Sequence, residues 1–165
     1  MIKELIDFKY IEYNELFIDN LLDKGNAEVF KGTYNEKDIA IKKYEYDEFN
    51  INEIIKELVI GSNTESERLM KTYGYSYDKE KEYLYLIMEY INSSDLGKYI
   101  SSYYDEDYEY CLSIETKLSI IKSVLKSIRD MWVEGIVHGD LKPLNLAIHR
   151  RNDEIFIKII DYGTC

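Results

Sequence analysis

The sequence predicts an α+β fold, with a strand-rich first half followed by a more helical second half. Short apolar runs rich in β-branched and aromatic residues, separated by polar turns, recur through residues 16–88, and this pattern is typical of strands. A single stretch near residue 55 instead carries apolar residues at helical spacing. After residue 113 the apolar residues fall four and three positions apart over about five turns, which predicts a long amphipathic helix.

Five strands are expected in the first half, at residues 16–18, 29–34, 39–44, 69–77 and 83–88. The polar residues 35–38 have the composition of a turn, so the second and third strands should pair as a hairpin. The charged residues 78–82 separate the last two strands in the same way. Another hairpin is expected near the end of the sequence, where residues 146–148 and 155–160 flank the polar residues 150–153.

Two helices are expected. The first follows Asn52, a candidate N-cap, and would end near Gly61 or Asn63. The second would begin after the N-cap Ser113 and stop at Gly135. Its apolar stripe comprises Ile114, Leu118, Ile121, Leu125, Ile128 and Trp132. A stripe of this length has to pack against something, so we expect it to be buried.

Length, charge and composition exclude several classes of protein. The 165 residues suffice for one folding unit with a buried core, which can have two lobes. A formal net charge of −11 and the lack of a basic run argue against nucleic-acid binding. The sequence has neither a signal-peptide pattern nor a run of eighteen apolar residues, so we expect a cytoplasmic protein without membrane association. Cys111 and Cys165 have no metal-ligand spacing, so no zinc site is expected.

The most specific signal is an eight-residue stretch between the long helix and the strand that follows it. Residues 138–145 read His-Gly-Asp-Leu-Lys-Pro-Leu-Asn. Two weaker signals accompany it, Ile-Ala-Ile-Lys at residues 39–42 and Asp-Tyr-Gly at residues 161–163. The three stretches resemble, respectively, the catalytic loop, the ATP-contacting strand and the metal-binding triad of eukaryotic protein kinases.

This resemblance implies a bilobal protein-kinase-like fold. Residues 1–90 would form the ATP-binding N-lobe, a five-stranded antiparallel sheet with one C-helix. Residues 91–165 would form the hinge and a truncated helical C-lobe that carries the catalytic loop. In the family, the activation segment and the peptide-binding platform follow the metal-binding triad. We therefore expect either a fragment or a minimal form in which a partner covers the long helix.

The resemblance also assigns roles in phosphate transfer from ATP with Mg²⁺. Asp140 would orient the substrate hydroxyl and accept its proton, and Lys142 would lie near the transferring phosphate. Asn145 and Asp161 would hold Mg²⁺, which prefers oxygen ligands. His138 would be a packed core histidine rather than a catalytic group.

Nucleotide contacts are implied mainly for the first half. Lys42 would contact the ATP phosphates and pair with a glutamate of the first helix. Glu57 is favoured as that partner, and Glu53, one turn away on the same face, is the alternative. Ile87 falls at the gatekeeper position, and the backbone of residues 89–91 would hold adenine. The positions assigned to ATP are Leu21, Lys24, Gly25, Ala27, Val29, Ala40, Lys42, Ile87, Glu89, Tyr90 and, as the ribose contact, Asp95.

Two features depart from the family pattern. Leu22, Lys24 and Ala27 occupy the sites of the phosphate-loop glycines, and only Gly25 lies nearby. A Cβ at each site should loosen the clasp on phosphate, for which the charge of Lys24 can compensate. Gly139 stands where many kinases carry an arginine that binds a phosphorylated activation loop, so control by that route is not expected.

The expected function is that of a serine/threonine protein kinase acting on protein substrates in intracellular signalling. Lys142 resembles the catalytic loop of Ser/Thr-specific kinases, and residues 13–18 resemble the tyrosine-kinase-like group. Two alternatives stay open. One is a shortened, catalytically weak homologue that binds a kinase-pathway partner as a decoy, and the other is a nucleotide sensor that transfers no phosphate.

Overall fold

The computed structural model describes residues 5, 7–25, 27–45, 51–104, 112–152 and 154–162. The expectations attached to Cys111, Gly163 and Cys165 lie outside these residues. The chain divides into two compact units. The first comprises Met1–Thr64 and Lys71–Ile91, and the second comprises Glu65–Met70 and Asn92–Cys165.

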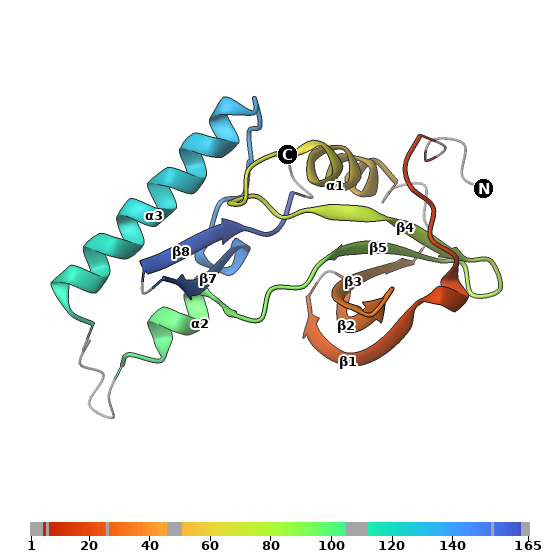
Figure 1. Cartoon of the computed structure of the whole chain (residues 1–165), viewed down its shortest axis with the longest axis horizontal. Coiled ribbons are helices and arrows are strands. Elements are labelled where there is room, and N and C mark those ends of the chain that lie inside the picture. The colour runs from red at the N-terminus through yellow and green to blue at the C-terminus, as the bar shows by residue number, and fades with distance from the viewer. Residues whose placement is uncertain are drawn as a thin grey trace. The chain divides into compact units, whose positions relative to one another are not determined.

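The first unit is built on a five-stranded sheet in the order β1-β2-β3-β5-β4, in which every neighbouring pair is antiparallel (Figure 1). Its strands are β1 (Phe17–Lys24), β2 (Glu28–Tyr34), β3 (Lys37–Glu45), β4 (Thr72–Asp78) and β5 (Tyr83–Glu89). The 3-10 helix η2 (Tyr13–Glu15) precedes the sheet, and helix α1 (Ile51–Asn63) lies between β3 and β4 in the sequence. The predicted α+β class, with a five-stranded antiparallel sheet, is confirmed.

Strands β2 and β3 form the predicted hairpin. Asn35 and Glu36 are its two turn residues, with φ angles of 48° and 62°. Positive φ at both positions is the type I′ geometry, which matches the twist of the flanking strands. The resulting register sets Lys42 opposite Val29.

The sheet buries residues on both faces of β3. Ile39 and Ile41 belong to a hydrophobic cluster, whose other fully packed members are Ile11, Leu16, Tyr85 and Ile87. Because successive side chains of a strand point to opposite faces, Ala40, Lys42 and Tyr44 lie on the other face. Ala40 and Tyr44 are buried there as well.

Two strand boundaries of the first unit differ from those predicted by three residues or more. Strand β1 runs to Lys24 rather than ending at residue 18. All its residues are exposed, so it lacks the apolar alternation that marks a half-buried strand, and pairing with β2 defines it instead. Strand β4 begins at Thr72 rather than at residue 69, because the Met70 N–H donates to the Ile159 C=O of the second unit at 2.9 Å.

Helix α1 continues through Gly61 and ends at Asn63, the second of the two predicted stop positions. A Cβ at this position would clash with Thr72 Oγ1 and would lie 2.9 Å from the Thr72 backbone nitrogen. Gly61 also lies on the buried face of the helix, together with Glu57 and Leu58. The glycine therefore permits a close approach of α1 to β4 and does not terminate the helix.

The second unit combines a three-stranded sheet, in the order β6-β7-β8, with two helices. Its elements are β6 (Ser94–Asp95), α2 (Leu96–Ser101), α3 (Ile114–Val133), the 3-10 helix η3 (Pro143–Asn145), β7 (Leu146–Arg151) and β8 (Glu154–Ile159). Strands β7 and β8 are the predicted hairpin before Asp161. Ser113 caps α3 as predicted, since its hydroxyl accepts a hydrogen bond from the Thr116 N–H at 3.2 Å. None of the described helices is long and apolar enough to cross a membrane.

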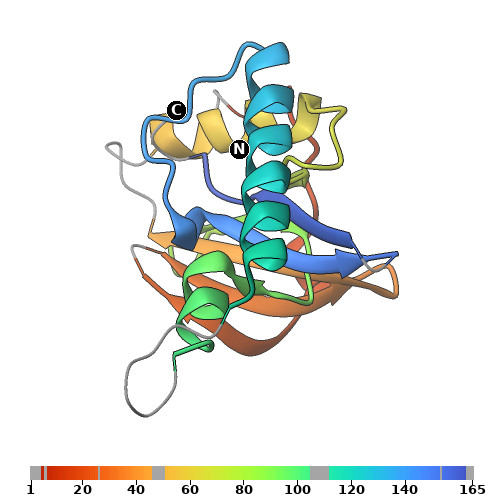
Figure 2. The same cartoon turned by 90° about the vertical axis from the view of Figure 1, so that its left-hand side faces the viewer.

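Helix α3 lies against β8 (Figure 2). It packs there through serines rather than through its apolar stripe. Ser127 Oγ donates to the Ile157 C=O at 2.8 Å, and the Ile157 N–H donates to Ser123 Oγ at 2.9 Å. Strand β8 is an edge strand, so its outward backbone groups need partners when they are buried. The two serine hydroxyls meet that need, and both serines are buried.

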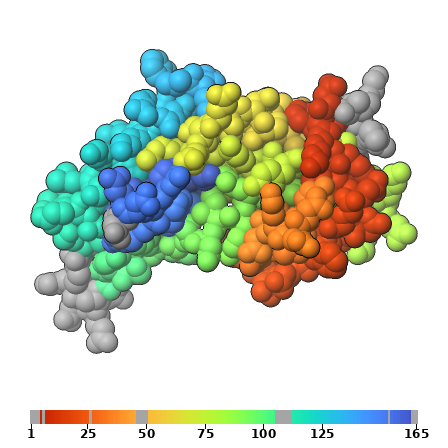
Figure 3. Space-filling model, in the orientation of Figure 1, coloured from red at the N-terminus to blue at the C-terminus, as the bar shows by residue number. Residues whose placement is uncertain are grey.

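The apolar stripe of α3 is exposed, contrary to expectation. The exposed fractions are 62% for Ile114, 60% for Leu125 and 75% for Trp132. Leu118 and Ile121 are exposed as well, and only Ile128 is half-buried. Figure 3 shows the side chains of α3, in cyan, on an outer surface of the second unit. The prediction failed because the backbone of the β8 edge, not the hydrophobicity of the stripe, determines which face of α3 packs.

The segment Glu65–Met70 is attached to the second unit, although it lies between α1 and β4 in the sequence. Ser66 Oγ donates to Asp130 Oδ2 of α3 at 2.9 Å. The Arg68 guanidinium donates to Ser123 Oγ at 3.0 Å. Polar contacts of this kind leave no periodic pattern in the sequence, and none was predicted.

The close contact at Gly61 generates a testable prediction for the fold. We expect Gly61→Ala to lower the free energy of unfolding by about 1–3 kcal/mol, because the added methyl group has to displace the Thr72 backbone. Gly25→Ala is the matched control, since its Cβ would meet nothing nearer than Asp23 Oδ2 at 3.6 Å. Chemical denaturation measures both. Equal stability of the two variants would contradict the packing described for α1.

Candidate active site

An ion pair between Lys42 and Glu57 joins β3 to α1. The distance between Lys42 Nζ and Glu57 Oε1 is 2.5 Å. Glu57 is only 3% exposed, and the Lys42 side chain is 13% exposed. A carboxylate buried to this degree needs a cationic partner, because an unpaired charge in the interior is costly. Of the two glutamates considered from the sequence, Glu57 is the one in this pair.

Tyr44 is a third member of this cluster, which was not predicted from the sequence. Its hydroxyl donates to the same Glu57 Oε1 at 2.8 Å, and Lys42 Nζ lies 5.3 Å from the centroid of its ring. Burial and the nearby Glu57 charge raise the pKa of Tyr44 well above its usual value, so the hydroxyl stays protonated. Strand alternation was the available signal, since Tyr44 lies two residues after Lys42.

The catalytic-loop residues form a second polar cluster, immediately before β7. Lys142 Nζ lies 2.5 Å from Asp140 Oδ2. Asn145 Nδ2 donates to the Asp140 C=O at 2.9 Å and more weakly to Asp140 Oδ2 at 3.4 Å. His138 is buried and accepts a long hydrogen bond from the Asp140 N–H at 3.4 Å. Gly139 has a φ of 77°, a value that favours glycine over the arginine of many kinases.

These contacts define the charge state of Asp140. The hydrogen bond from Lys142 lowers the pKa of the Asp140 carboxyl, the Lys142 charge and Asn145 add to that shift, and desolvation opposes it. Asp140 is therefore ionised near neutral pH and can accept a hydrogen bond from a hydroxyl group. A carboxylate with a lowered pKa is a weak base, so orienting a hydroxyl suits it better than removing its proton early.

The β7–β8 hairpin brings Asn145 and Asp161 to neighbouring backbone positions. The Ile160 N–H donates to the Asn145 C=O at 3.1 Å, one step beyond the paired residues Leu146 and Ile159. Asp161 follows directly and is half-buried. Tyr162 anchors the segment, since its side chain is 2% exposed and its hydroxyl lies 3.4 Å from the Ile159 C=O.

The oxygen donors of Asn145 and Asp161 fit a magnesium ion that arrives with a nucleotide. The Asn145 amide nitrogen is used in the hydrogen bonds to Asp140, which leaves its amide oxygen as a ligand. Within the described part of the chain, no group of three or more His, Cys, Asp or Glu side chains could hold a metal. Mg²⁺ needs no such cage, because it is commonly bound by one or two protein oxygens together with phosphate oxygens.

One nucleotide assignment is corrected by the strand register. Ile87 pairs with Ile41 and is fully buried in the hydrophobic cluster, on the face of the sheet opposite Lys42. The prediction that Ile87 lines the nucleotide site is therefore wrong. Met88 pairs with Ala40 and shares the face that carries Lys42. Counting alternate positions along β5 would have placed Met88, rather than Ile87, on the face that carries Lys42.

The other predicted nucleotide contacts are dispersed around the first sheet. Val29 lies opposite Lys42, and Ala40 is buried on the same face. Leu21 and Lys24 lie on the exposed strand β1, and Lys24 forms an ion pair with Glu28 at 3.5 Å. The remaining positions in this strand connection are the exposed Gly25 and the half-buried Ala27.

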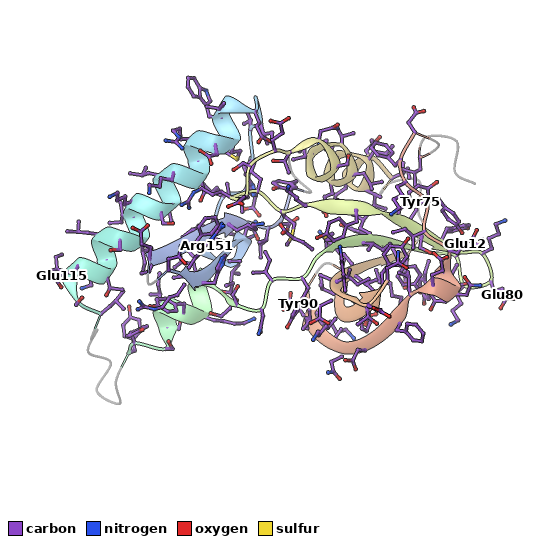
Figure 4. The ribbon with its side chains drawn as sticks, viewed as in Figure 1. Glu12, Tyr75, Glu80, Tyr90, Glu115 and Arg151 are labelled. Atoms are coloured by element: carbon purple, nitrogen blue, oxygen red, sulfur yellow. The ribbon has the colours of Figure 1, made fainter. Side chains whose placement is uncertain are left out.

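Three further predicted nucleotide contacts, Glu89, Tyr90 and Asp95, lie at the end of β5 or after it. The Glu89 carboxylate accepts a hydrogen bond from the Lys71 N–H at 2.9 Å. Tyr90, labelled in Figure 4, has Lys31 Nζ 4.9 Å from its ring centroid. Asp95 belongs to the second unit and is the N-cap of α2, where its Oδ1 accepts from the Lys98 N–H at 2.8 Å. N-capping of α2 is therefore a structural role for Asp95 that does not involve a ribose.

Comparison with known proteins agrees with these features. The family model described as protein kinase domain matches residues 23–165. A protein of Dictyostelium discoideum named "Probable LIM domain-containing serine/threonine-protein kinase" is 30% identical over 166 residues, which cover 98% of this chain and 24% of that protein. An L-type lectin-domain containing receptor kinase, V.5, of Arabidopsis thaliana is 31% identical over 150 residues, which cover 87% of this chain and 22% of that protein. The chain spans about a quarter of the length of these relatives.

The chain belongs to the protein kinase family. The match includes the strand with Lys42, the catalytic loop and the residues up to position 165. The predicted family is confirmed.

The cluster around Asp140 generates a testable prediction. We expect Lys142→Met to raise the pKa of Asp140, because the cation that stabilises the carboxylate is lost. The carboxyl ¹³C resonance of Asp140, followed by NMR as the pH is lowered from 7, should then begin to shift at a higher pH than in the wild type. Lys98→Met is the control, since Lys98 pairs with Asp95 and not with Asp140. An unchanged Asp140 titration in Lys142→Met would contradict the assigned contact.

Proposed function

We propose that this chain carries out ATP-dependent transfer of the γ-phosphate to serine or threonine residues of protein substrates. The observation that carries the proposal is the buried pair of Lys42 and Glu57. A buried ion pair adds little net stability compared with apolar residues of the same size, so its placement on a sheet face is better explained by a positioning task. In phosphate transfer that task is to hold an ammonium group toward phosphate oxygens.

The second unit supplies the remaining parts of the proposed site. Asp140 would accept a hydrogen bond from the substrate hydroxyl and aim its oxygen at the phosphate. Lys142 would follow the phosphate as charge moves, which a flexible ammonium group can do. Asn145 and Asp161 would bind Mg²⁺, which when present neutralises phosphate charge. Convergence of these residues with Lys42 on one nucleotide is part of the proposal.

Serine/threonine specificity is the finer part of the proposal. Lys142 lies in direct contact with Asp140, where it would meet both the substrate hydroxyl and the phosphate. One relative that matches almost the whole chain carries serine/threonine-protein kinase in its name. Both observations favour this specificity over tyrosine.

We expect the nucleotide to be held weakly by the connection between β1 and β2. Three positions of this chain correspond to the phosphate-loop glycines of the family. Two of them lie on β1, and they carry the exposed residues Leu22 and Lys24. The Lys24 ammonium is already near Glu28, so its charge is partly neutralised. Lys24 can therefore compensate only in part for the looser contact with phosphate that the missing glycines cause.

A second candidate function is binding to a protein partner without transfer. The observation that favours it is the exposed apolar stripe of α3, from Ile114 to Trp132, beside Lys122, Lys126 and Arg129. A partner for this face would present apolar side chains with flanking carboxylates. The same experiment separates the two candidates.

The experiment compares the wild type with Asp161→Ala and Asp140→Asn. We expect Mg-ATP to raise the melting temperature of the wild type and of Asp140→Asn, but not of Asp161→Ala, because only the last loses a magnesium ligand. Transfer of radiolabelled phosphate to a mixed Ser/Thr peptide library should fall at least about a hundredfold in Asp140→Asn.

Asp130→Asn is the control for these variants, because Asp130 contacts Ser66 and Arg129 away from the catalytic loop. It should retain both the thermal shift and the transfer. Equal transfer by the wild type and Asp140→Asn would contradict the kinase proposal and would leave partner binding and nucleotide sensing as the remaining candidates.

A further inference from the structure

Glu57 is held by residues of two strands, β3 and β4. Thr72 of β4 donates its hydroxyl to the Glu57 backbone C=O at 3.3 Å. Tyr44 of β3 donates its hydroxyl to the Glu57 carboxylate at 2.8 Å, and Lys42 of the same strand approaches the same oxygen. Both the backbone and the side chain of Glu57 are therefore attached to the sheet.

The Tyr44 contact is well placed to hold the carboxylate. Tyr44 is 6% exposed and Glu57 is 3% exposed, so a hydrogen bond between them is shielded from water. Hydrogen bonds to ionised groups are stronger than those between neutral groups. An apolar residue at position 44 would remove one of the two donors that the described residues of β3 offer to Glu57 Oε1. A lysine on a flexible four-carbon chain fixes a carboxylate less well than a lysine and a rigid phenol together.

Tyr44 and Lys42 differ in whether they have a second group to bind besides Glu57. The Lys42 ammonium is needed by phosphate once a nucleotide is present, and it then divides its hydrogen bonds between phosphate and carboxylate. The Tyr44 hydroxyl has no such second task, and its burial keeps it protonated. It can therefore hold Glu57 both with and without a nucleotide.

We propose that Tyr44 is a positioning residue that keeps the Glu57 carboxylate facing Lys42, so that α1 stays docked on the sheet before a nucleotide binds. This inference rests on the proposed function, because it concerns the same ammonium group. In this role Tyr44 would touch neither substrate nor nucleotide. It acts through Glu57.

The test uses the whole chain with Tyr44→Phe, which removes the hydroxyl and keeps the ring. We expect the Kd for Mg-ATP to rise about tenfold, the size expected for loss of a hydrogen bond to a charged group. In a Glu57→Met background, where no carboxylate remains, the same change should alter Kd less than about twofold. An equal loss in both backgrounds would show that the Tyr44 hydroxyl does not act through Glu57 and would overturn the proposal.

Tyr75→Phe is the matched control. Tyr75, labelled in Figure 4, lies on β4 of the same unit and is 1% exposed. Its hydroxyl has no hydrogen-bond partner among the described residues, so its removal should not raise the Kd. A rise equal to that of Tyr44→Phe would also overturn the proposal, since any buried tyrosine would then have the same effect.

A second measurement distinguishes failure of this inference from failure of the proposed function. Amide hydrogen exchange in α1, without nucleotide, should be faster in Tyr44→Phe than in the wild type and in Tyr75→Phe. In the Glu57→Met background, Tyr44→Phe should add no further increase. If the wild type binds no Mg-ATP, the proposed function fails, and the exchange data alone decide: unchanged exchange in Tyr44→Phe would refute the role of Tyr44, and the expected pattern would support it.

Discussion

The contact on which the first unit depends is the ion pair between Lys42 and Glu57. It requires β3 to point Lys42 away from the hydrophobic cluster, and it requires α1 to turn Glu57 toward the sheet. Gly61 permits the helix to approach closely enough, and the hairpin at Asn35 fixes the register of β3 against β2. The local features of this unit thus serve one arrangement, in which a buried charge is neutralised on a sheet face.

In the second unit, hydrogen bonds rather than a buried ion pair hold the polar residues in place. The loop before β7 has no regular ladder, and Asn145 stabilises it by donating to the backbone of Asp140. The β7–β8 hairpin then places Asp161 one residue beyond the backbone partner of Asn145. An irregular loop and a regular hairpin thereby bring Asn145 and Asp161 to neighbouring backbone positions. The lowered pKa of Asp140 follows from the cation that the loop holds beside it.

The sequence predicted most of the fold and much of the site, and the failures have physical causes. Motif spacing identified Lys42, Glu57 and the catalytic loop, because fixed chemistry demands fixed offsets. Of the two predicted stop positions of α1, Asn63 is the end of the helix, whereas Gly61 is a packing position, since close helix–sheet contact and termination both favour glycine. Ile87 was assigned to the wrong face because an uninterrupted apolar strand, buried on both sides, shows no alternation. The packed face of α3 depends on hydrogen bonds to β8, which hydrophobicity alone does not reveal.

The most direct test of the central claim is whether Lys42 and the proposed magnesium ligands, Asn145 and Asp161, act on the same nucleotide. Paramagnetic Mn²⁺ with ATP, compared with Mg²⁺ and ATP, broadens NMR signals near the metal. We predict loss of the amide signals of Asn145 and Asp161 together with a nucleotide-dependent shift of the Lys42 signal, and weaker nucleotide binding by Lys42→Met than by the wild type. Broadening confined to other carboxylates, with Asn145 and Asp161 unaffected, would contradict that claim.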